Sequence, residues 1–321
     1  MKTASTAIKP GNKPVNSLKK DGIAKRFWKT RFLFLLFLPT LAYYIIFAYI
    51  PMWGVSMAFM EYDVWGGLAT SKWVGFKQFE LFFRSPMAVM TTKNTLVLGL
   101  TAILFEFPTT IVFSLLLNEI RGAKFKKVAQ TVSYLPHFLS TVIMCAMINT
   151  LLDPSNGGIN LIITALGGEP IYFMTRKEWF IPVWIISDIW KGLGWSTIVY
   201  LAAISSVDPG LYEAARLDGA GRIRQMASIT LPSILPTVTT MLVLKFGQVM
   251  NQSMEKALLL THTATYEVST ILSTYAFNMS FGMISNFSLA QAINLYTAAV
   301  NLALLLITNF ISEKLTDNGI L

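Results

Sequence analysis

The sequence predicts an all-α integral membrane protein with six transmembrane helices. Hydrophobic residues make up 54% of the 321 residues and charged residues only 13%, about half the usual share. The mean hydropathy is +0.54, and a soluble core of this size cannot hide so much apolar surface from water. Six stretches are apolar over about the 20 residues that a membrane-spanning helix needs. A soluble enzyme is therefore excluded, and the single cysteine, Cys145, excludes an internal disulfide.

The predicted spans are spread along the chain: residues 32–59, 95–117, 128–152, 180–204, 238–254 and 289–311. The first contains Pro39 and Pro51 and is longer than the apolar stretch of a secretory signal, so we expect it to be retained. The fifth has the weakest signal, because it is short and contains several polar residues. Residues 1–31 are expected to form a basic flexible tail and residues 312–321 a short C-terminal tail.

Lysine and arginine are distributed asymmetrically over the predicted loops. Nine of the 26 lie in the first 31 residues. If the amino terminus is inside, 17 lie in inside segments, 7 in outside loops and 2 within spans. Positive charge marks the cytoplasmic side, so both termini are predicted to be cytoplasmic. The lipid bilayer accounts for the basic tail, and no zinc-ligand spacing or basic–aromatic array supports nucleic acid binding.

Two long outside loops, residues 60–93 and 153–179, are rich in tryptophan, tyrosine and glycine. Amphipathic aromatic side chains favour the lipid–water boundary, so one interpretation is an aromatic belt along the outer membrane surface. The other interpretation is a docking face for an external protein.

The segment between predicted spans four and five, residues 205–237, has the pattern of a helix–turn–helix. The pair Asp208-Pro209 indicates a helix start, with a side-chain acceptor at the N-cap and proline at the first helical position. Gly219 is typical of a helix end. A second short helix is expected over residues 222–229, and the pair Leu231-Pro232 is expected to end it.

The same loop carries a motif with fixed identities at fixed spacing. Glu213-Ala214-Ala215 is followed by three residues, Gly219, nine residues, Ile229, one residue and then Leu231-Pro232. This string resembles the EAA loop of the permease subunits of binding-protein-dependent ABC importers. The wider string LYEAARLDGA resembles the sugar-importing branch. The long first outside loop and, separately, the string GGIN at 157–160 resemble permeases for polysaccharide fragments or alginate-type oligosaccharides.

The resemblance implies a fold and a set of coupling residues. Members share an all-α permease fold of the MetI type, in which the EAA loop forms a coupling helix seated in a cleft of a cytoplasmic ATPase subunit. Glu213 is then expected to contact the rim of the cleft, while Ala214 and Ala215 allow close packing. The predicted coupling residues are Glu213, Ala214, Ala215, Asp218, Gly219, Ile229, Leu231 and Pro232.

The resemblance also implies partners and a location. The partners are a second EAA-loop permease, expected to form a heterodimer with this chain, two cytoplasmic ATP-binding subunits and an extracytoplasmic solute-binding protein. The expected location is the bacterial cytoplasmic (inner) membrane. No Gly-Lys dipeptide occurs, so the sequence has no P-loop to cradle phosphate. We therefore expect a non-catalytic subunit that binds no cofactor, with ATP and Mg²⁺ on the ATPase subunits, and no metal site at His137 or His262.

Ionisable residues within the predicted spans are Glu106, Asp188, Lys191 and Lys245. Such groups are costly at membrane depth and mark a pathway or a pairing. Asp188 and Lys191 are three residues apart, so they can neutralise each other on one helix face. Alternatively, Lys191 faces a water-filled cavity, with Trp190 and Trp195 close to it in the sequence.

Polar side chains recur in the last two predicted spans. Lys245, Gln248 and Gln252 follow each other at helical spacing in the fifth span. Asn294 and Asn301 share one face of the sixth. Amides bond well to sugar hydroxyls and aromatic rings pack on pyranose faces, although amides also hold membrane helices together. The predicted substrate pathway comprises Trp190, Lys191, Trp195, Lys245, Gln248, Asn251, Gln252 and Asn294.

The predicted function is that of a permease subunit of an ATP-driven importer for oligosaccharides or polysaccharide fragments, forming half of the pathway. Lysines facing a cavity favour an anionic cargo such as a uronic-acid oligomer, whereas the amides also suit a neutral sugar. Two alternatives stay open. One is the same architecture with a non-sugar solute, and the other is an ion-driven secondary transporter that uses Glu106 and Asp188.

Overall fold

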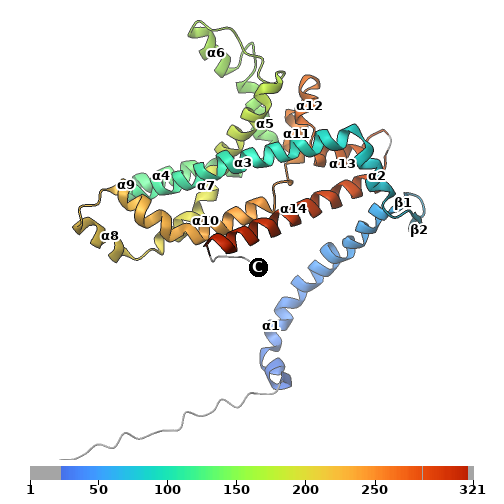
Figure 1. The fold of residues 1–321 in the computed structure, drawn as a ribbon, viewed down its shortest axis with the longest axis horizontal. Helices are drawn as coiled ribbons and strands as arrows, with labels where there is room; N and C mark the ends of the chain where they lie inside the picture. Colours follow the sequence, from blue (N-terminus) through green and yellow to red (C-terminus); the bar gives the residue numbers. More distant parts are fainter. Residues whose placement is uncertain (1–22, 284, 317–321) are drawn as a thin grey trace, which may run out of the picture. The chain divides into compact units, whose positions relative to one another are not determined.

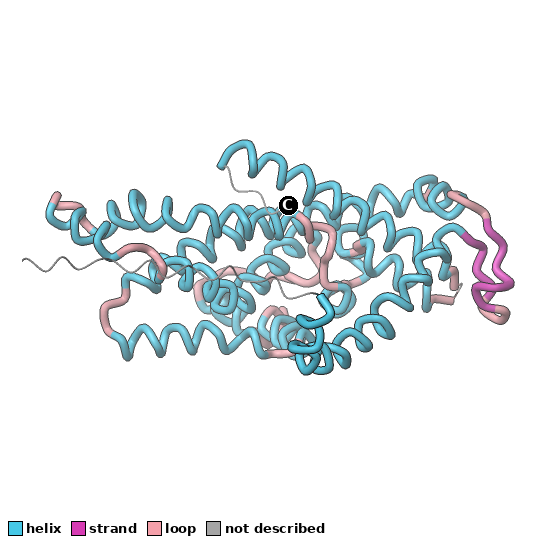
Figure 2. The backbone as a smooth tube through the Cα atoms, turned by 90° about the horizontal axis from the view of Figure 1, so that it is seen from below, coloured by secondary structure: helices cyan, strands magenta, loops and turns pink. Residues whose placement is uncertain are grey.

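The computed structural model describes residues 23–283 and 285–316 and is built mainly of helices. It divides into two compact units, Met1–Val55 and Ser56–Leu321, and the second contains a helix bundle (Figure 1). Within the described residues, strands occur only in one hairpin at an end of that bundle (Figure 2). This arrangement agrees with the predicted all-α class.

The described part of the first unit, from residue 23 on, is a single helical segment. Helix α1 (Ile23–Tyr44) continues through the π-helical turn η1 (Ile45–Tyr49) into the 3₁₀ helix η2 (Ile50–Phe59), whose last residues belong to the second unit. Pro39 lies inside α1 without ending it. The helical segment Thr30–Phe59 is long and apolar enough to cross a membrane, in agreement with the first predicted span, 32–59.

Four long helices form the frame of the second unit. Helix α3 packs along α7, while α10 packs against α14 and α7. Figure 1 shows α3 and α14 running along the length of the bundle. The four helices are α3 (Pro86–Glu119), α7 (Lys177–Ser205), α10 (Leu231–Phe246) and α14 (Phe287–Thr316).

Short elements connect the long helices. Those before α7 are β1 (Met60–Asp63), β2 (Gly67–Trp73), α2 (Lys77–Arg84), α4 (Ala123–Tyr134), η3 (Leu135–Phe138), α5 (Thr141–Leu151) and α6 (Gly158–Ala165). Those after α7 are α8 (Pro209–Leu217), α9 (Arg222–Gln225), η4 (Met226–Thr230), α11 (Met254–Leu260), η5 (Thr263–Thr265), α12 (Tyr266–Ser269) and α13 (Leu272–Phe281).

The first predicted outside loop begins with an ordered hairpin. Strands β1 and β2 pair antiparallel, with Met60 opposite Trp73. In the turn, Asp63 accepts hydrogen bonds from the Trp65 backbone N–H at 3.0 Å and from the Thr70 hydroxyl at 3.1 Å. Because the Trp65 bond and the other turn bonds favour the ionised carboxylate, the pKa of Asp63 is lowered from its usual value.

The core consists of three buried clusters stacked along α3. The first, around Trp184 and Leu98, joins α3, α5, α7 and α11. The second, around Phe82, joins α2, α3, α13 and α14. The third, around Phe107 and Tyr200, joins α3, α7 and α10. Burying these side chains fixes the register of α3 against α7 and α10, and thereby the residues that face each other between them.

The third predicted span is broken, which corrects the expectation of a continuous helix over residues 128–152. Residues 123–138 and α5 meet at a bend of 99°. Pro136 lies in η3 and has no backbone N–H to donate, and Ser140 starts α5 as its N-cap by accepting a hydrogen bond from Ile143 N at 3.2 Å.

The fifth predicted span is displaced toward the amino terminus. Leu231-Pro232 does not end the second helix of the cytoplasmic loop, because α9, η4 and α10 run without a break from Arg222 to Phe246. The helix instead ends at Phe246 with Gly247 as its C-cap, so residues 248–253 lie outside it. Pro232 lies inside this helix, two residues after the end of the π-helical turn η4, and such a widened turn makes room for the proline ring.

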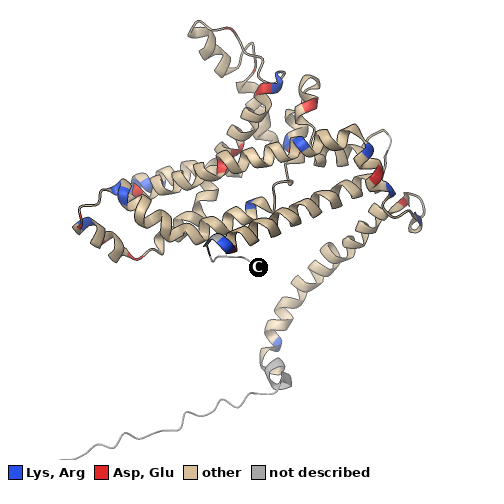
Figure 3. Cartoon of the chain, in the orientation of Figure 1, with Lys and Arg blue, Asp and Glu red and all other residues tan. Residues whose placement is uncertain are grey.

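Four helical segments of the described chain are long and apolar enough to span a membrane, and the bent pair would make a fifth: Thr30–Phe59, Pro86–Glu119, Arg222–Phe246, Phe287–Lys314 and the pair Ala123–Phe138 with Thr141–Leu151. Helix α7 coincides with the predicted span 180–204 and is 29 residues long, but Asp188 and Lys191 lower its hydropathy. Six spans thus remain a prediction. Lys and Arg gather around α4, α8 and α9, whereas the middle of α14 contains no charged residue and that of α3 only Glu106 (Figure 3).

Candidate functional site

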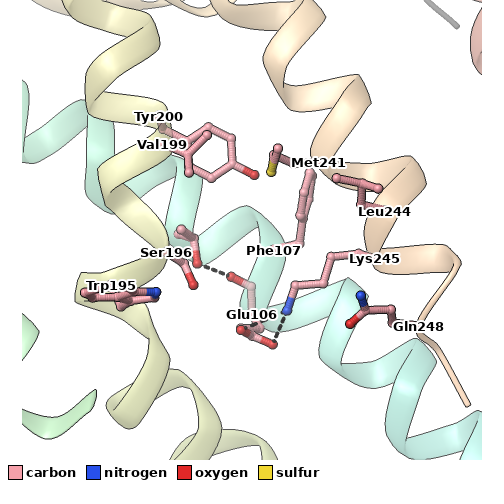
Figure 4. A pocket seen from close by; sticks show the side chains of 11 residues that line it. Glu106, Phe107, Trp195, Ser196, Val199, Tyr200, Met241, Leu244, Lys245 and Gln248 are labelled. Atoms are coloured by element: carbon pink, nitrogen blue, oxygen red, sulfur yellow. Dashed lines mark hydrogen bonds and ion pairs between the residues drawn. The ribbon is translucent and has the colours of Figure 1, made fainter. Parts of the chain in front are cut away.

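A cavity of about 290 Å³ lies between α3, α7 and α10. Figure 4 shows that its walls combine charged, aromatic and aliphatic side chains from all three helices. Glu106 comes from α3, Trp195 and Tyr200 from α7, and Lys245 from the last turn of α10. The cavity therefore unites two of the predicted pathway residues, Trp195 and Lys245, with a third, Gln248, just beyond the helix end.

An ion pair stands at the centre of this cavity. Lys245 Nζ lies 3.1 Å from both carboxylate oxygens of Glu106, as the dashed lines in Figure 4 indicate. The Glu106 side chain is 14% exposed, whereas the Lys245 side chain keeps 43% of its surface accessible. An ammonium group has three N–H donors, so Lys245 can hold Glu106 and still bond to a molecule in the cavity.

The indole of Trp195 is held flat by a stacked neighbour. Its ring lies 4.5 Å from the His137 ring, with an angle of only 1° between the planes, and Phe138 contacts it edge-on. Trp195 itself remains 48% exposed. Stacking on one face of an aromatic ring leaves the other face free to pack on an apolar surface, such as one face of a pyranose. The sequence did not predict the stacking of His137 on Trp195, because the two residues lie on different helices.

A second cavity, of about 610 Å³, begins on the other side of the turn that ends α10. It is lined by amides and hydroxyls, among them the predicted residues Asn251, Gln252 and Asn294. Asn301 Nδ2 donates to Asn251 Oδ1 at 2.9 Å, and Asn301 Oδ1 accepts from Met250 N at 2.9 Å. Asn301 therefore holds α14 against the segment after α10. Asn294, on the same helix, is exposed.

The expected polar stripe along one helix face is thus wrong. Lys245 and Gln248 line the first cavity, whereas Asn251 and Gln252 line the second. The stripe assumed helical spacing over all four residues, but α10 ends at Phe246 and the chain turns away. The two cavities consequently differ in chemistry: the first is charged and aromatic, the second neutral and rich in amides.

Asp188 and Lys191 do not pair with each other, which corrects the local interpretation. Asp188 Oδ1 lies 2.7 Å from Lys256 Nζ, and Lys191 Nζ donates to Thr141 Oγ1 at 3.3 Å. Lys256 also donates to the carbonyl of Trp184 at 2.8 Å. Lys256 follows the fifth predicted span, 238–254, and is one of the seven cations predicted to lie in outside loops, yet its side chain is only 2% exposed. Trp190 lines a third cavity, of about 390 Å³, whose walls are almost wholly apolar.

The cytoplasmic loop contains the predicted helix–turn–helix. Asp208 caps α8 by accepting a hydrogen bond from Gly210 N at 2.8 Å. The helix ends at Gly219, whose φ of +77° is accessible to glycine at little cost, and Ala220 N donates to Ala215 O at 2.8 Å across that turn. Gln225 Nε2 then bonds to Ala220 O at 2.7 Å and fixes the start of the second helix.

The predicted coupling residues lie on two distinct surfaces. Glu213, Ala214, Asp218 and Gly219 are exposed on α8 and its turn, and Ala215 is half-buried. Leu217, next to them, is 90% exposed. Ile229, Leu231 and Pro232 instead belong to the long helix, at the π-helical turn η4 and the start of α10. The motif thus covers two separate places: an exposed face of α8 and the first residues of α10, a helix of the bundle.

Comparison with known proteins assigns the chain to a family. Residues 110–317 match the model of the binding-protein-dependent transport system inner membrane component. The chain belongs to this family. The resemblance predicted from the EAA motif is therefore confirmed, and the chain is a membrane-embedded transport permease.

Several members of the family are similar over nearly their whole length. The polygalacturonan/rhamnogalacturonan transport system permease protein YteP of Bacillus subtilis is 41% identical over 302 residues, which cover 94% of each chain. Protein LplB of the same organism is 39% identical over 292 residues, covering 91% of this chain and 92% of LplB.

Two solved structures share the fold of this permease. A bacterial ABC transporter involved in the import of the acidic polysaccharide alginate contains a chain that is 37% identical, with a TM-score of 0.84, covering 92% of this chain and 100% of the other. A bacterial alginate ABC transporter in complex with an alginate pentasaccharide-bound periplasmic protein gives a TM-score of 0.85 at the same identity, covering 94% and 100%. The predicted permease fold is therefore confirmed.

Proposed function

We propose that this permease forms half of the translocation pathway of an ATP-driven importer for acidic oligosaccharides, and that uronate-containing fragments of polysaccharides are its cargo. One observation carries this proposal: a partly exposed lysine, Lys245, and an exposed flat indole, Trp195, line one cavity in the middle of the bundle. Relatives named for polygalacturonan, rhamnogalacturonan and alginate transport support the same class of cargo.

In this proposal the charged cavity holds one uronate residue of the cargo. The free face of Trp195 packs on the pyranose ring, and a free N–H of Lys245 bonds to the sugar carboxylate. Glu106 neutralises Lys245 while the cavity is empty, which lowers the cost of an ionised lysine at membrane depth. Gln248 offers an amide to neighbouring hydroxyls. The second, amide-lined cavity accepts a neighbouring sugar unit through uncharged hydrogen bonds.

The same proposal assigns the cytoplasmic loop to energy coupling. The exposed α8 face with Glu213, Ala214 and Ala215 seats in a cleft of a cytoplasmic ATP-binding subunit, and Asp218, Gly219, Ile229, Leu231 and Pro232 complete the coupling loop. Two such subunits hold ATP and Mg²⁺. A second EAA-loop permease completes the pathway as a heterodimer, and an extracytoplasmic binding protein delivers cargo. Both termini are cytoplasmic, consistent with the clustering of Lys and Arg around α4, α8 and α9 (Figure 3).

The test is transport by the complex purified from native membranes and reconstituted into vesicles. We expect a second permease and an ATP-binding protein to co-purify, and uptake of a uronate oligosaccharide to require ATP and to exceed uptake of a neutral oligosaccharide of equal length. Glu213→Ala should abolish uptake while the chain still inserts into the membrane. Uptake that ignores ATP would favour an ion-driven transporter, and faster uptake of the neutral sugar would contradict the acidic cargo.

A further inference from the structure

A single hydrogen bond connects α8 to the helix that follows it. The hydroxyls of Tyr212 and Thr230 lie 2.9 Å apart, although the residues are 18 positions apart in the sequence. Thr230 is only 1% exposed, and Tyr212 is half-buried. Within the described part of the chain, no other side chain of α8 bonds to the helical rod from Arg222 to Phe246. Neither hydroxyl is explained by the EAA motif itself, which does not include these residues.

Thr230 lies in a widened helical turn, two residues before the proline of the motif. Thr230 is the last residue of the π-helical turn η4, in which Leu231 N donates to Met226 O, five residues back. Pro232 has no N–H, and in a regular α-helix its ring would collide with the carbonyl four residues earlier. A π turn widens the helix at that point. The same pairing recurs in the first unit, where the π turn η1 ends at Tyr49, two residues before Pro51.

The rod that carries Thr230 also carries the charged cavity. Residues 230 and 245 are separated by 15 positions on one continuous helix, which corresponds to about 22 Å along its axis. Lys245 at the far end holds Glu106 of α3. A displacement of Thr230 along or around the rod axis is therefore delivered to Lys245, because a helix packed against α7 and α14 moves largely as a unit.

The covalent connection between α8 and the rod is a poor transmitter of force. It consists of residues 218–221, which include Gly219 at a φ of +77° and Gly221, and it lies at the surface. Glycine-containing turns absorb changes in backbone angles at little cost. A movement of α8 would be taken up in this turn unless a second contact bound α8 to the rod. The Tyr212–Thr230 hydrogen bond is such a contact, one residue before Glu213.

We propose that the hydrogen bond between Tyr212 and Thr230 transmits movements of α8 to α10 and hence to the Glu106–Lys245 pair. Tyr212 is then a positioning residue that couples ATP-driven movement to the charged cavity without touching ATP or cargo. This inference rests on the proposed function, in which α8 seats in an ATP-binding subunit. In this account the π turn directly before the Leu-Pro pair of the motif is what presents Thr230 to Tyr212.

The first test compares uptake with ATP hydrolysis in the same reconstituted complex. Tyr212→Phe and Thr230→Val each remove one hydroxyl and keep the shape of the side chain. We expect each to lower the amount of sugar taken up per ATP by about fivefold, the effect of one neutral hydrogen bond, while ATP hydrolysis and co-purification stay within about twofold. The double variant should be no worse than either single variant. Thr239→Val is the matched control, since its hydroxyl bonds only to carbonyls of α10 itself.

The second test follows the cavity directly. Val199 lines the charged cavity and is 43% exposed, and Cys145 is the only cysteine of the chain. In a Cys145→Ala/Val199→Cys background, the rate of thiol modification should change when ATP is added. Adding Tyr212→Phe should remove that change, whereas adding Thr239→Val should not.

Three outcomes would overturn the inference. If Tyr212→Phe transports with unchanged stoichiometry and keeps the ATP-dependent change in modification of the introduced thiol, the link does not transmit. If Tyr212→Phe loses the ATP-binding subunits and hydrolysis together with uptake, the bond only stabilises the loop. If the unmodified complex shows no ATP-dependent uptake at all, the proposed function itself fails. The first two outcomes differ from this one, because in them the unmodified complex still transports.

Discussion

The Asp188–Lys256 pair and the Glu106–Lys245 pair join the same kinds of charge inside one bundle, yet their surroundings differ. Lys256 is 2% exposed, bonds to the Trp184 carbonyl at 2.8 Å and lies 4.3 Å from the centre of the Trp184 ring. Lys245 is 43% exposed and faces a cavity. The Lys256 ammonium group is thus enclosed by protein, whereas Lys245 keeps a donor for a molecule in the cavity. Burial, rather than the presence of a charge at membrane depth, separates a structural pair from a candidate binding group.

Breaking the buried pair should have the largest effect. Asp188→Asn leaves Lys256 without a counter-charge among apolar side chains, so we expect the free energy of unfolding to fall by about 3–5 kcal/mol. The midpoint of thermal unfolding in mild detergent measures this. The double variant Asp188→Leu/Lys256→Met removes both charges and should recover most of the loss. A single variant as stable as the parent would show that this pair does not hold α7 to α11.

Breaking the open pair should change transport more than stability. Glu106→Gln removes the carboxylate that competes for Lys245, so we expect the KM for a uronate oligosaccharide to fall by about tenfold and that for a neutral one to stay within about twofold. The free energy of unfolding should change by only about 1 kcal/mol, because Lys245 reaches the cavity. Equal changes in KM for both sugars would contradict the distinction between the two pairs.

A third pair, at the surface, should have the smallest effect. Lys177 and Glu267 are 51% and 68% exposed, and exposed pairs contribute little to stability. The hydrogen bond from Lys177 holds the pKa of Glu267 below its usual value of 4.5. A carboxyl with a lowered pKa stabilises the fold above its unfolded pKa, and this contribution is lost as pH falls through the folded pKa.

Lys177→Gln should therefore leave the unfolding midpoint at pH 7 nearly unchanged. It should also weaken the small loss of stability that the parent shows on acidification below pH 4.5. Thermal unfolding of both proteins over a pH series checks this. A large loss of stability at pH 7 would mean that the exposed fraction of an ion pair does not predict how much the pair contributes to stability.

Local sequence rules predicted the cytoplasmic loop well. The Asp208 cap, the turn at Gly219 and the two helices around it depend on neighbours within a few residues, and all are present. The same rules failed at Leu231-Pro232, where the helix continues past the proline after the π-helical turn η4. They failed again at Ser140, where the third predicted span bends by 99°.

The charged site was only partly predictable for a related reason. Glu106 and Lys245 stood out as ionisable residues in apolar stretches, but helical spacing reports only on neighbours along one helix. Their pairing is set by the packing of α3 against α10, as is the pairing of Asp188 with Lys256 by the packing of α7 against α11. The polar residues after Phe246 were assigned to one face because the end of α10 carries no strong signal except Gly247.

The central claim is that Lys245 in the charged cavity recognises the carboxylate of an acidic sugar. The most direct measurement is the ratio of uronate to neutral oligosaccharide uptake by vesicles containing the complex with Lys245→Gln, with Lys177→Gln as control. We expect Lys245→Gln to lower uronate uptake at limiting concentration by at least about tenfold and neutral uptake by less than about twofold, while Lys177→Gln changes neither. An unchanged ratio in Lys245→Gln would contradict the claim.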